Sequence, residues 1–118
     1  MRFVLVAGAG AAGALARYAV ALAAGTQRFP WPTMAINVAG CFLLGLLLHS
    51  DRFSADTTTV LAVGFLGAFT TFSTFGYETV ALLRSERAAA ALAYAGLSVG
   101  LGVGAAALGW SAGRLLSS

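Results

Sequence analysis

Four long apolar stretches, at roughly 3–24, 31–48, 58–83 and 88–110, are separated by short segments that hold nearly all of the charged residues. An α-helix rises about 1.5 Å per residue, so ~20 apolar residues cross the roughly 30 Å of hydrocarbon in a bilayer. Each stretch reaches or approaches this length. The pattern predicts an all-α membrane protein in which residues 1–118 form a single domain of four transmembrane helices.

Composition supports a location in a lipid bilayer. Hydrophobic residues make up 59% of the chain and charged residues only 9%, against about 25% charged residues in soluble domains. We therefore expect a multi-pass protein of the cell (inner) membrane. The seven basic residues are all arginines, scattered over the termini and loops without a basic run, which excludes nucleic acid as a partner.

The first apolar stretch also matches two unrelated patterns. Arg2, the apolar run and Ala21–Ala23 imitate a secretory signal with a cleavage site, but Arg17 interrupts the run and we count it as the first span. Residues 8–13 match the glycine pattern of a dinucleotide-binding turn. That fold needs an acidic residue ~20 positions later, and the first carboxylate here is Asp51, so we reject a nucleotide site.

The third stretch is unusual between residues 64 and 78, because hydroxyl and aromatic side chains alternate there. The hydroxyls are Thr70, Thr71, Ser73 and Thr74, and the aromatic rings are Phe69, Phe72 and Phe75. Hydroxyls can bond back to carbonyls of the preceding turn, but four in five positions exceed what that role needs. Since Gly64, Gly67 and Gly76 bracket them, we expect a break in this helix that exposes backbone groups to a cavity or ion.

Asn37 lies inside the second apolar stretch, after Pro32 and Thr33 open a helix, and Gly40, Cys41 and Gly45 follow near the same helical face. A carboxamide in hydrocarbon needs partners, because leaving it unpaired costs several kcal/mol. Two roles remain open for it. Asn37 either bonds a neighbouring helix or points an N–H group into a pore.

Three further polar residues also have two readings each. Arg17 either extends to the lipid headgroups or lowers the energy of an anion in a water-filled vestibule. Tyr94 and Ser98 stand one turn apart on the fourth span and either join helices or face a common path. Rings such as Phe72 can turn their positive edges toward an anion, although phenylalanine in membranes usually packs against lipid or protein.

Catalytic and metal-binding patterns are missing from the sequence. Glu78 lies near Arg84, Glu86 and Arg87, which predicts an interfacial salt bridge, and His49 is expected in solvent. We find no nucleophile with a base and no metal-ligating cluster of side chains, so we expect no enzyme. The single Cys41 precludes an intrachain disulfide.

The arginines give almost no orientation signal. Four crossings place Arg2, Arg52 and Arg114 on one side and Arg28, Arg84 and Arg87 on the other, so the positive-inside rule is balanced. We expect both orientations, which permits an antiparallel homodimer and makes a label on Ser118 reachable from both faces. Gly96, Gly100 and Gly104, together with Gly8 and Gly10–Gly13, allow close helix contacts either within one chain or between chains.

These residues resemble the Fluc/CrcB family of small fluoride channels from the first span to the fourth. The resemblance rests on Gly13–Tyr18, on Thr33–Gly45 with Asn37 and Gly40, and on Gly64–Glu78 with its specific Thr-Thr-Phe-Ser-Thr-Phe motif. It implies an antiparallel, dual-topology homodimer with two fluoride pathways. It also implies passive export of fluoride from the cytoplasm, which confers fluoride resistance.

The resemblance also assigns roles to residues. Phe72 and Phe75 correspond to the rings whose edges face fluoride, Asn37 to the pore asparagine, and Tyr94 and Ser98 to the start of a polar track. From their own chemistry, Thr71 and Ser73 are expected on the same pathway and Arg17 at a vestibule. A structural sodium ion is implied at the dimer centre, held by the backbone carbonyls of Gly67 and Thr70.

The chain departs from the family pattern at two positions. Gly102 stands where many members continue the polar track with a hydroxyl, and Cys41 stands where serine is common. We expect water to take a larger part in coordinating the ion along that outer stretch. The main alternative is a small proton-coupled multidrug exporter of dual topology, which requires a carboxylate within the membrane, and the first two spans contain none.

Overall fold

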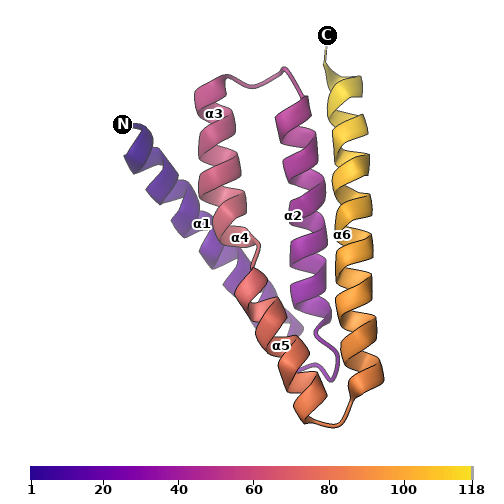
Figure 1. Cartoon of the computed structure of the whole chain (residues 1–118). Helices are drawn as coiled ribbons and strands as arrows, with labels where there is room; N and C mark the ends of the chain where they lie inside the picture. Colours follow the sequence, from indigo (N-terminus) through magenta and orange to yellow (C-terminus); the bar gives the residue numbers. More distant parts are fainter. Residues whose placement is uncertain (118) are drawn as a thin grey trace.

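The computed structural model describes residues 1–117 and contains helices alone as regular structure in that range (Figure 1). Four helical stretches are long and apolar enough to cross a membrane, at Arg2–Ala24, Trp31–His49, Ala55–Arg84 and Ala88–Leu116. The predicted all-α, four-span arrangement is confirmed, although the last helix continues past its predicted end near residue 110. Ser118, the expected labelling position, lies outside the described residues.

Three of the four stretches are single helices, and the third is composite. The single helices are α1 (Arg2–Ala24), α2 (Trp31–His49) and α6 (Ala88–Leu116). The third stretch contains α3 (Ala55–Thr59), the π-helix η1 (Val60–Leu66), α4 (Gly67–Phe69) and α5 (Phe72–Arg84). Thr70 and Thr71 have extended backbone, and the chain bends there between α4 and α5 (Figure 1).

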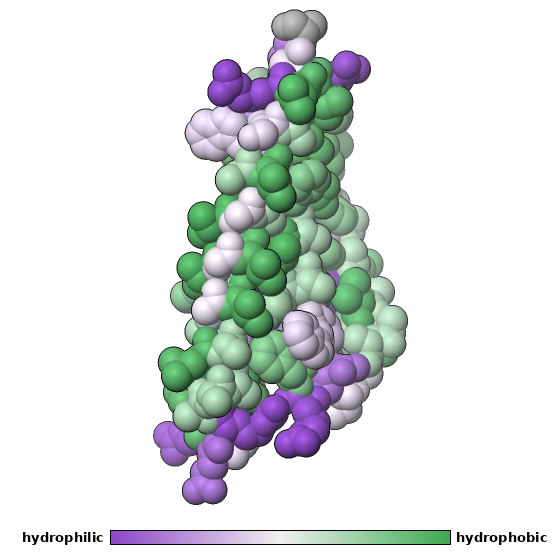
Figure 2. Space-filling view, turned by 90° about the vertical axis from the view of Figure 1, so that its right-hand side faces the viewer, coloured by the Kyte–Doolittle hydropathy of each residue, from purple (hydrophilic) through white to green (hydrophobic). Residues whose placement is uncertain are grey.

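Both termini and the loop between α2 and α3 lie at one end of the molecule (Figure 1). The α1–α2 loop and the α5–α6 turn lie at the other end, so the two sets of three arginines are distributed as predicted. Figure 2 shows hydrophobic residues along the body of one face and hydrophilic residues gathered toward its ends. This distribution suits a multi-pass membrane protein.

Glycine brings α2 and α6 into backbone contact along their length (Figure 1). A Cβ atom added at Gly109 would overlap the Phe42 carbonyl oxygen, and one at Gly45 would lie 2.5 Å from the Ala106 carbonyl oxygen. A methyl group at either position would therefore push the helices apart. Gly45 packs against α6 in this way and does not share the environment of Asn37, which corrects the expected common face.

The helix α1 packs against the first half of the third span and splays away from α2 and α6 toward its N-terminus (Figure 1). Its closest approach is at Gly13, where an added Cβ would overlap the Phe65 carbonyl oxygen of η1. A Cβ added at Gly64 on η1 would lie 2.9 Å from the Val6 carbonyl oxygen and from the Ala9 Cβ of α1. Small residues thus set this helix crossing, as in other membrane proteins.

A second glycine row on α6 faces away from every neighbour in the chain. Within residues 1–117, a Cβ added at Gly96, Gly100 or Gly104 would meet no atom within 4 Å outside its own helix. Figure 2 shows a narrow pale strip among hydrophobic side chains on the face that α6 presents. Packing inside one chain, one of the two readings of this row, is therefore excluded for the described structure.

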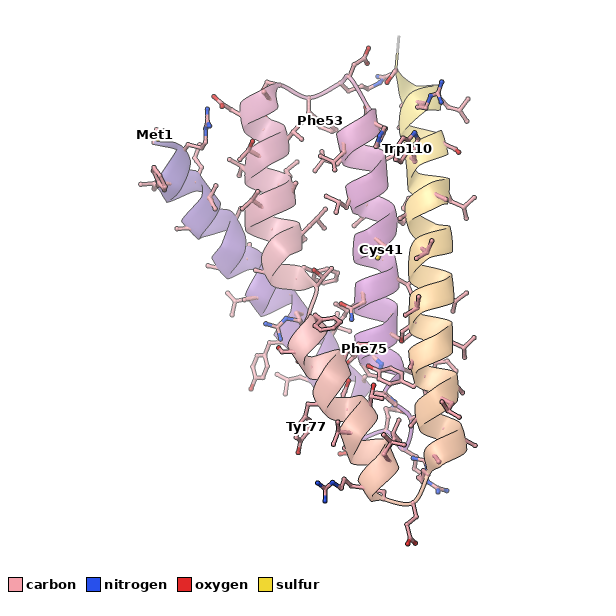
Figure 3. The ribbon with its side chains drawn as sticks, in the orientation of Figure 1. Met1, Cys41, Phe53, Phe75, Tyr77 and Trp110 are labelled. Atoms are coloured by element: carbon pink, nitrogen blue, oxygen red, sulfur yellow. The ribbon has the colours of Figure 1, made fainter. Side chains whose placement is uncertain are left out.

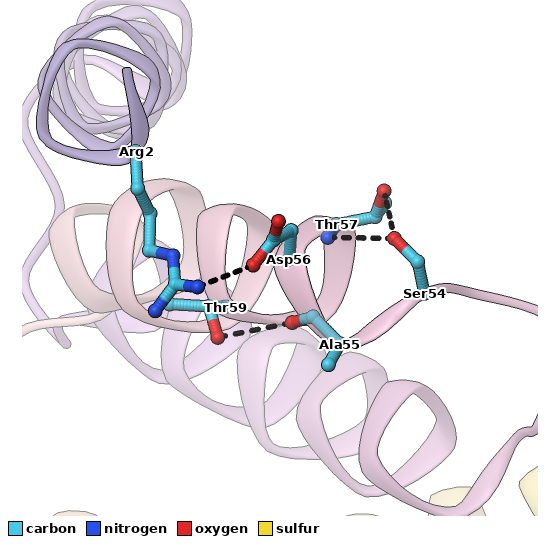
Figure 4. A network of polar contacts seen from close by, with 6 residues as sticks. All are labelled: Arg2, Ser54, Ala55, Asp56, Thr57 and Thr59. Atoms are coloured by element: carbon cyan, nitrogen blue, oxygen red, sulfur yellow. Dashed lines mark hydrogen bonds and ion pairs between the residues drawn. The ribbon is translucent and has the colours of Figure 1, made fainter.

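Polar contacts tie the chain together at the end that carries the termini (Figure 4). The Ser54 hydroxyl caps α3 by accepting from the Thr57 N–H at 3.1 Å. Arg2 and Asp56 form an ion pair of 2.6 Å between α1 and α3. Both side chains are largely exposed, so this pair adds only a little stability. Its main effect is to join the start of α1 to the third span.

Candidate ion pathway

The side chain of Asn37 holds the bend between α4 and α5. Its Nδ2 donates to the Thr71 carbonyl oxygen at 3.0 Å, and its Oδ1 accepts from the Thr71 N–H at 2.8 Å. One carboxamide thus pairs with both backbone groups of Thr71, the residue that precedes α5. Of the two roles left open for Asn37, bonding to another helix is observed. The second N–H of its Nδ2 is not used in this pairing.

This pairing releases backbone carbonyls from their helical bonds. In a continuous α-helix, the Thr71 N–H would donate to the Gly67 carbonyl and the Thr74 N–H to the Thr70 carbonyl. Here Thr71 donates to Asn37, and Thr74 donates to the Thr71 hydroxyl at 3.2 Å. The carbonyl oxygens of Gly67 and Thr70 therefore lose their helical donors and can accept from, or coordinate, another group.

A groove of about 350 Å³ opens beside the bend, between α2, the third span and α6. Most of the residues predicted for the pathway and the metal site line it, namely Asn37, Gly67, Thr70, Thr71, Phe72, Phe75 and Ser98. Cys41, one of the two departures from the family pattern, also lines it. The fold thus gathers residues from three different spans around one opening.

The rings of Phe72 and Phe75 differ in their surroundings. Phe72 is 83% exposed, whereas Phe75 is half-buried and points from α5 toward the other helices (Figure 3). Their centroids lie 6.0 Å apart. Phe69 stacks instead on Phe65 at 5.7 Å, because the bend at Thr70 and Thr71 interrupts the helical register. The three-residue repeat of the sequence therefore does not produce a continuous stack of three rings.

The hydroxyl groups predicted for the pathway and the metal site differ in whether they form hydrogen bonds within the chain. Thr70 bonds back to the Leu66 carbonyl at 3.0 Å, and Thr71 caps α5. Ser73 is exposed and does not line the groove. Ser98 lines the groove, and its buried Oγ has no hydrogen-bond partner within residues 1–117. A buried hydroxyl without a partner is costly, so Ser98 is well suited to meet a solute.

Tyr94 is fully buried, and it lines neither the groove nor the second cavity described below. Its hydroxyl donates to Glu78 Oε1 at 2.9 Å, and its ring lies 5.1 Å from that of Phe75. Glu78 takes this hydrogen bond in place of the expected salt bridge, since no ion pair of Glu78 occurs among the described residues. Tyr94 therefore packs beneath the groove and joins α6 to α5.

Arg17 and His49 are both directed toward the protein. Arg17 Nε donates to the Ala68 carbonyl oxygen at 3.1 Å, which braces α4 from α1. His49, expected in solvent, is half-buried and stacks on Trp110 with ring centroids 3.7 Å apart. The expectation for His49 is wrong because α6 extends past residue 110 and covers the end of α2.

The second cavity, of about 410 Å³, lies at the end of the molecule that carries the α1–α2 loop and the α5–α6 turn. Its lining includes Gln27, Arg28, Thr33, Glu78 and Arg87. Sequence reasoning did not bring these residues together. The available signal was that Arg28 precedes the span that carries Thr33 and that Arg87 follows the span that carries Glu78.

Comparison with known proteins gives a consistent result over nearly the whole chain. The family described as CrcB-like protein, Camphor Resistance (CrcB) matches residues 4–110. The chain is 45% identical to a fluoride-specific ion channel FluC of Acidobacterium capsulatum, covering 97% of each sequence. It is 45% identical to a FluC of Thermus thermophilus, covering 98% of this chain and 97% of that protein. FluC of Hyphomonas neptunium is 42% identical, with 98% of each covered.

Proposed function

Because this chain belongs to the CrcB-like family, together with the fluoride-specific ion channels FluC, we propose that it is a fluoride-selective channel. It releases fluoride from the cytoplasm passively, down the ion's gradient, and so confers fluoride resistance. The observation that supports this best is the groove beside the Asn37-braced bend, where hydroxyl, amide and aromatic groups of three spans meet. The relatives carry the name of a channel and not that of an enzyme.

The groove has the groups that an anion needs when it loses water. Moving a bare ion into a low-dielectric medium costs on the order of tens of kcal/mol, so protein donors must replace its hydration shell. Ser98 offers an unpaired hydroxyl, Asn37 a second amide N–H, and Phe72 and Phe75 ring edges. Thr71 and Ser73 lie at the start of α5, where backbone N–H groups also favour an anion.

The active unit is an antiparallel homodimer. Phe72 is 83% exposed in the single chain, and Gly67 at the bend is also exposed, so the groove is completed by a second copy. The open row of Gly96, Gly100 and Gly104 offers a further surface for close contact. The balanced arginines permit insertion in both orientations. Labels at the chain ends that react from one side only would reject mixed insertion.

A sodium ion at the dimer centre fits the released carbonyls. The Gly67 and Thr70 carbonyl oxygens have lost their helical donors, since Asn37 and the Thr71 hydroxyl accept those N–H groups. Oxygen ligands suit a hard cation. When bound, sodium would supply positive charge that holds the two bends together, and Gly67 and Thr70 of each copy would be its ligands.

The alternative, a proton-coupled multidrug exporter, is not favoured. Its chemistry needs a carboxylate that loads and releases protons inside the membrane, and α1 and α2 contain none. Glu78 in α5 accepts a hydrogen bond from Tyr94. The relatives at 42–45% identity carry the name of fluoride-specific channels.

Fluoride efflux from liposomes that contain the purified protein tests the proposal. We expect rapid loss of fluoride, negligible loss of chloride and a large decrease for Phe75→Ile. Because Phe75 also packs on Tyr94, Phe72→Ile serves as a second variant whose ring is exposed in the single chain. Correctly assembled dimers that retain fluoride in sealed vesicles would refute the channel.

A further inference from the structure

The lining of the second cavity mixes apolar residues with charged and polar groups that the proposed pathway has not used. Gln27 and Arg28 reach it from the α1–α2 loop, Thr33 from α2, Glu78 from α5 and Arg87 from the end of the α5–α6 turn. Arg84 lies three residues before Arg87 at the same end of the molecule but does not line the cavity. Two of the three arginines at this end therefore line the cavity.

Contacts of Tyr94 connect the lining of this cavity with that of the groove. Phe75 lines the groove and its ring centroid lies 5.1 Å from that of Tyr94, while the Tyr94 hydroxyl donates to Glu78, which lines the cavity. On α2, Asn37 in the groove follows Thr33 by one turn. The linings of the two spaces are therefore linked through Tyr94 and lie next to each other along α2.

The charges on the cavity wall determine which ions gather there. Arg28 and Arg87 supply two positive charges and Glu78 one negative charge, which leaves one net positive charge. The Arg87 guanidinium donates to the Arg28 backbone carbonyl, which holds the Arg87 side chain beside the α1–α2 loop. Glu78 is partly compensated by the Tyr94 hydroxyl. A concave site with low-dielectric walls and excess positive charge concentrates anions.

We propose that this cavity is the water-facing mouth of the fluoride path, where Arg28 and Arg87 raise the local anion concentration and offset repulsion from Glu78. The inference rests on the proposed channel function and extends it, since it assigns the mouth to loop arginines. Arg17, which the sequence suggested for a vestibule, braces α4 through Ala68 and lines neither space.

The test compares fluoride efflux of Arg28→Gln/Arg87→Gln with that of Arg84→Gln in liposomes. Arg84→Gln is the matched control for the single variants Arg28→Gln and Arg87→Gln, because it also removes one charge at the same end but does not touch the cavity. Measurements are made at about 10 mM and about 150 mM ionic strength, set with an impermeant salt, where screening lengths are roughly 30 Å and 8 Å. We expect the double variant to lose about three- to tenfold in rate at low ionic strength and much less at high ionic strength.

Further variants separate charge from geometry. Arg87→Lys should keep most of the rate, because the charge is retained, whereas a loss equal to that of Arg87→Gln would assign a structural role and overturn the proposal. An equal loss for Arg84→Gln, or no loss for the double variant, would also overturn it. If the unmodified protein releases no fluoride, the channel function itself has failed, and that result is distinct from the others.

Discussion

Small and polar residues have opposite effects in two regions, the α2–α6 pair and the bend between α4 and α5. In the pair, Gly45, Gly109 and Gly113 let two regular helices touch through their backbones, and each helix keeps its own hydrogen bonds. At the bend, Asn37 and the Thr71 hydroxyl take backbone donors away from the helix. Close packing of the pair gives a rigid support. At the bend, the diverted donors leave carbonyl oxygens beside the groove that can bind another group.

The two regions depend on each other through α2. One side of this helix packs on α6, and another carries Asn37, Gly40 and Cys41 along the groove. A Cβ added at Gly40 would overlap the Thr70 side chain, so the bend also requires a small residue opposite it. The rigid pair therefore positions the carboxamide that stabilises the bend, and variants in the two regions should fail differently.

The largest effect is expected from Gly109→Val. Its side chain would overlap the Phe42 backbone, which cannot rotate away, so α2 and α6 must separate. We expect a loss of about 3 kcal/mol or more in stability, because overpacking costs about 1–3 kcal/mol and lost helix contacts add to it. Heat-induced loss of the assembled protein in detergent provides the measurement.

Gly100→Val is the matched control for that variant. A Cβ added at this position would have no atom outside its own helix within 4 Å among residues 1–117, so the packing of a single chain should not change. Equal destabilisation of the two variants in a forced monomer would contradict the assigned difference between the glycine rows.

Asn37→Leu should have the next largest effect. It keeps the heavy-atom branching of the side chain but removes the groups that pair with the Thr71 N–H and carbonyl. Unpaired buried groups of this kind cost about 1–3 kcal/mol, and we expect fluoride efflux to fall at least about tenfold. Unchanged efflux with unchanged thermal stability would show that the bend does not need the carboxamide.

Thr71→Val should cause a smaller change. It removes the hydroxyl that accepts from the Thr74 N–H while it keeps the branched shape. Loss of a helix cap costs about 0.5–2 kcal/mol, so thermal stability should decrease within that range. Thr79→Val is a suitable control, since the Thr79 hydroxyl only bonds back to Phe75 within α5. A larger effect at Thr79 would argue against the cap.

Modification of Cys41 should have the smallest effect on the fold. It tests whether the part of the groove that Cys41 lines lies on the path of fluoride. Cys41 lines the groove, and its sulfur would lie 3.5 Å from a Cβ added at Gly102. A small thiol-specific reagent should slow fluoride efflux about twofold or more, because the added group narrows the opening. Cys41→Ser should be insensitive to the reagent. Inhibition of Cys41→Ser to the same degree would place the reactive site elsewhere.

Much of the architecture follows from local sequence. Four apolar stretches predicted four spans because a helix must reach a minimum length to cross hydrocarbon, and the hydroxyl-rich stretch at residues 70–74 coincided with the bend. The motif residues Asn37, Phe75 and Ser98 were also expected near one another, and they share the groove. Helix ends were less well placed, since α6 continues to Leu116.

The spacing of residues in the sequence does not show which of them contact each other between helices. The sequence by itself determined how many times the chain crosses the membrane and where polar groups interrupt the spans, because those features depend on length and composition within one segment. Only the tertiary structure decided that Gly109 packs while Gly100 stays open, that Tyr94 bonds Glu78, and that Asn37 pairs with Thr71. Each depends on the rotation and offset of one helix against another, and a few tenths of a turn is enough to change the partner.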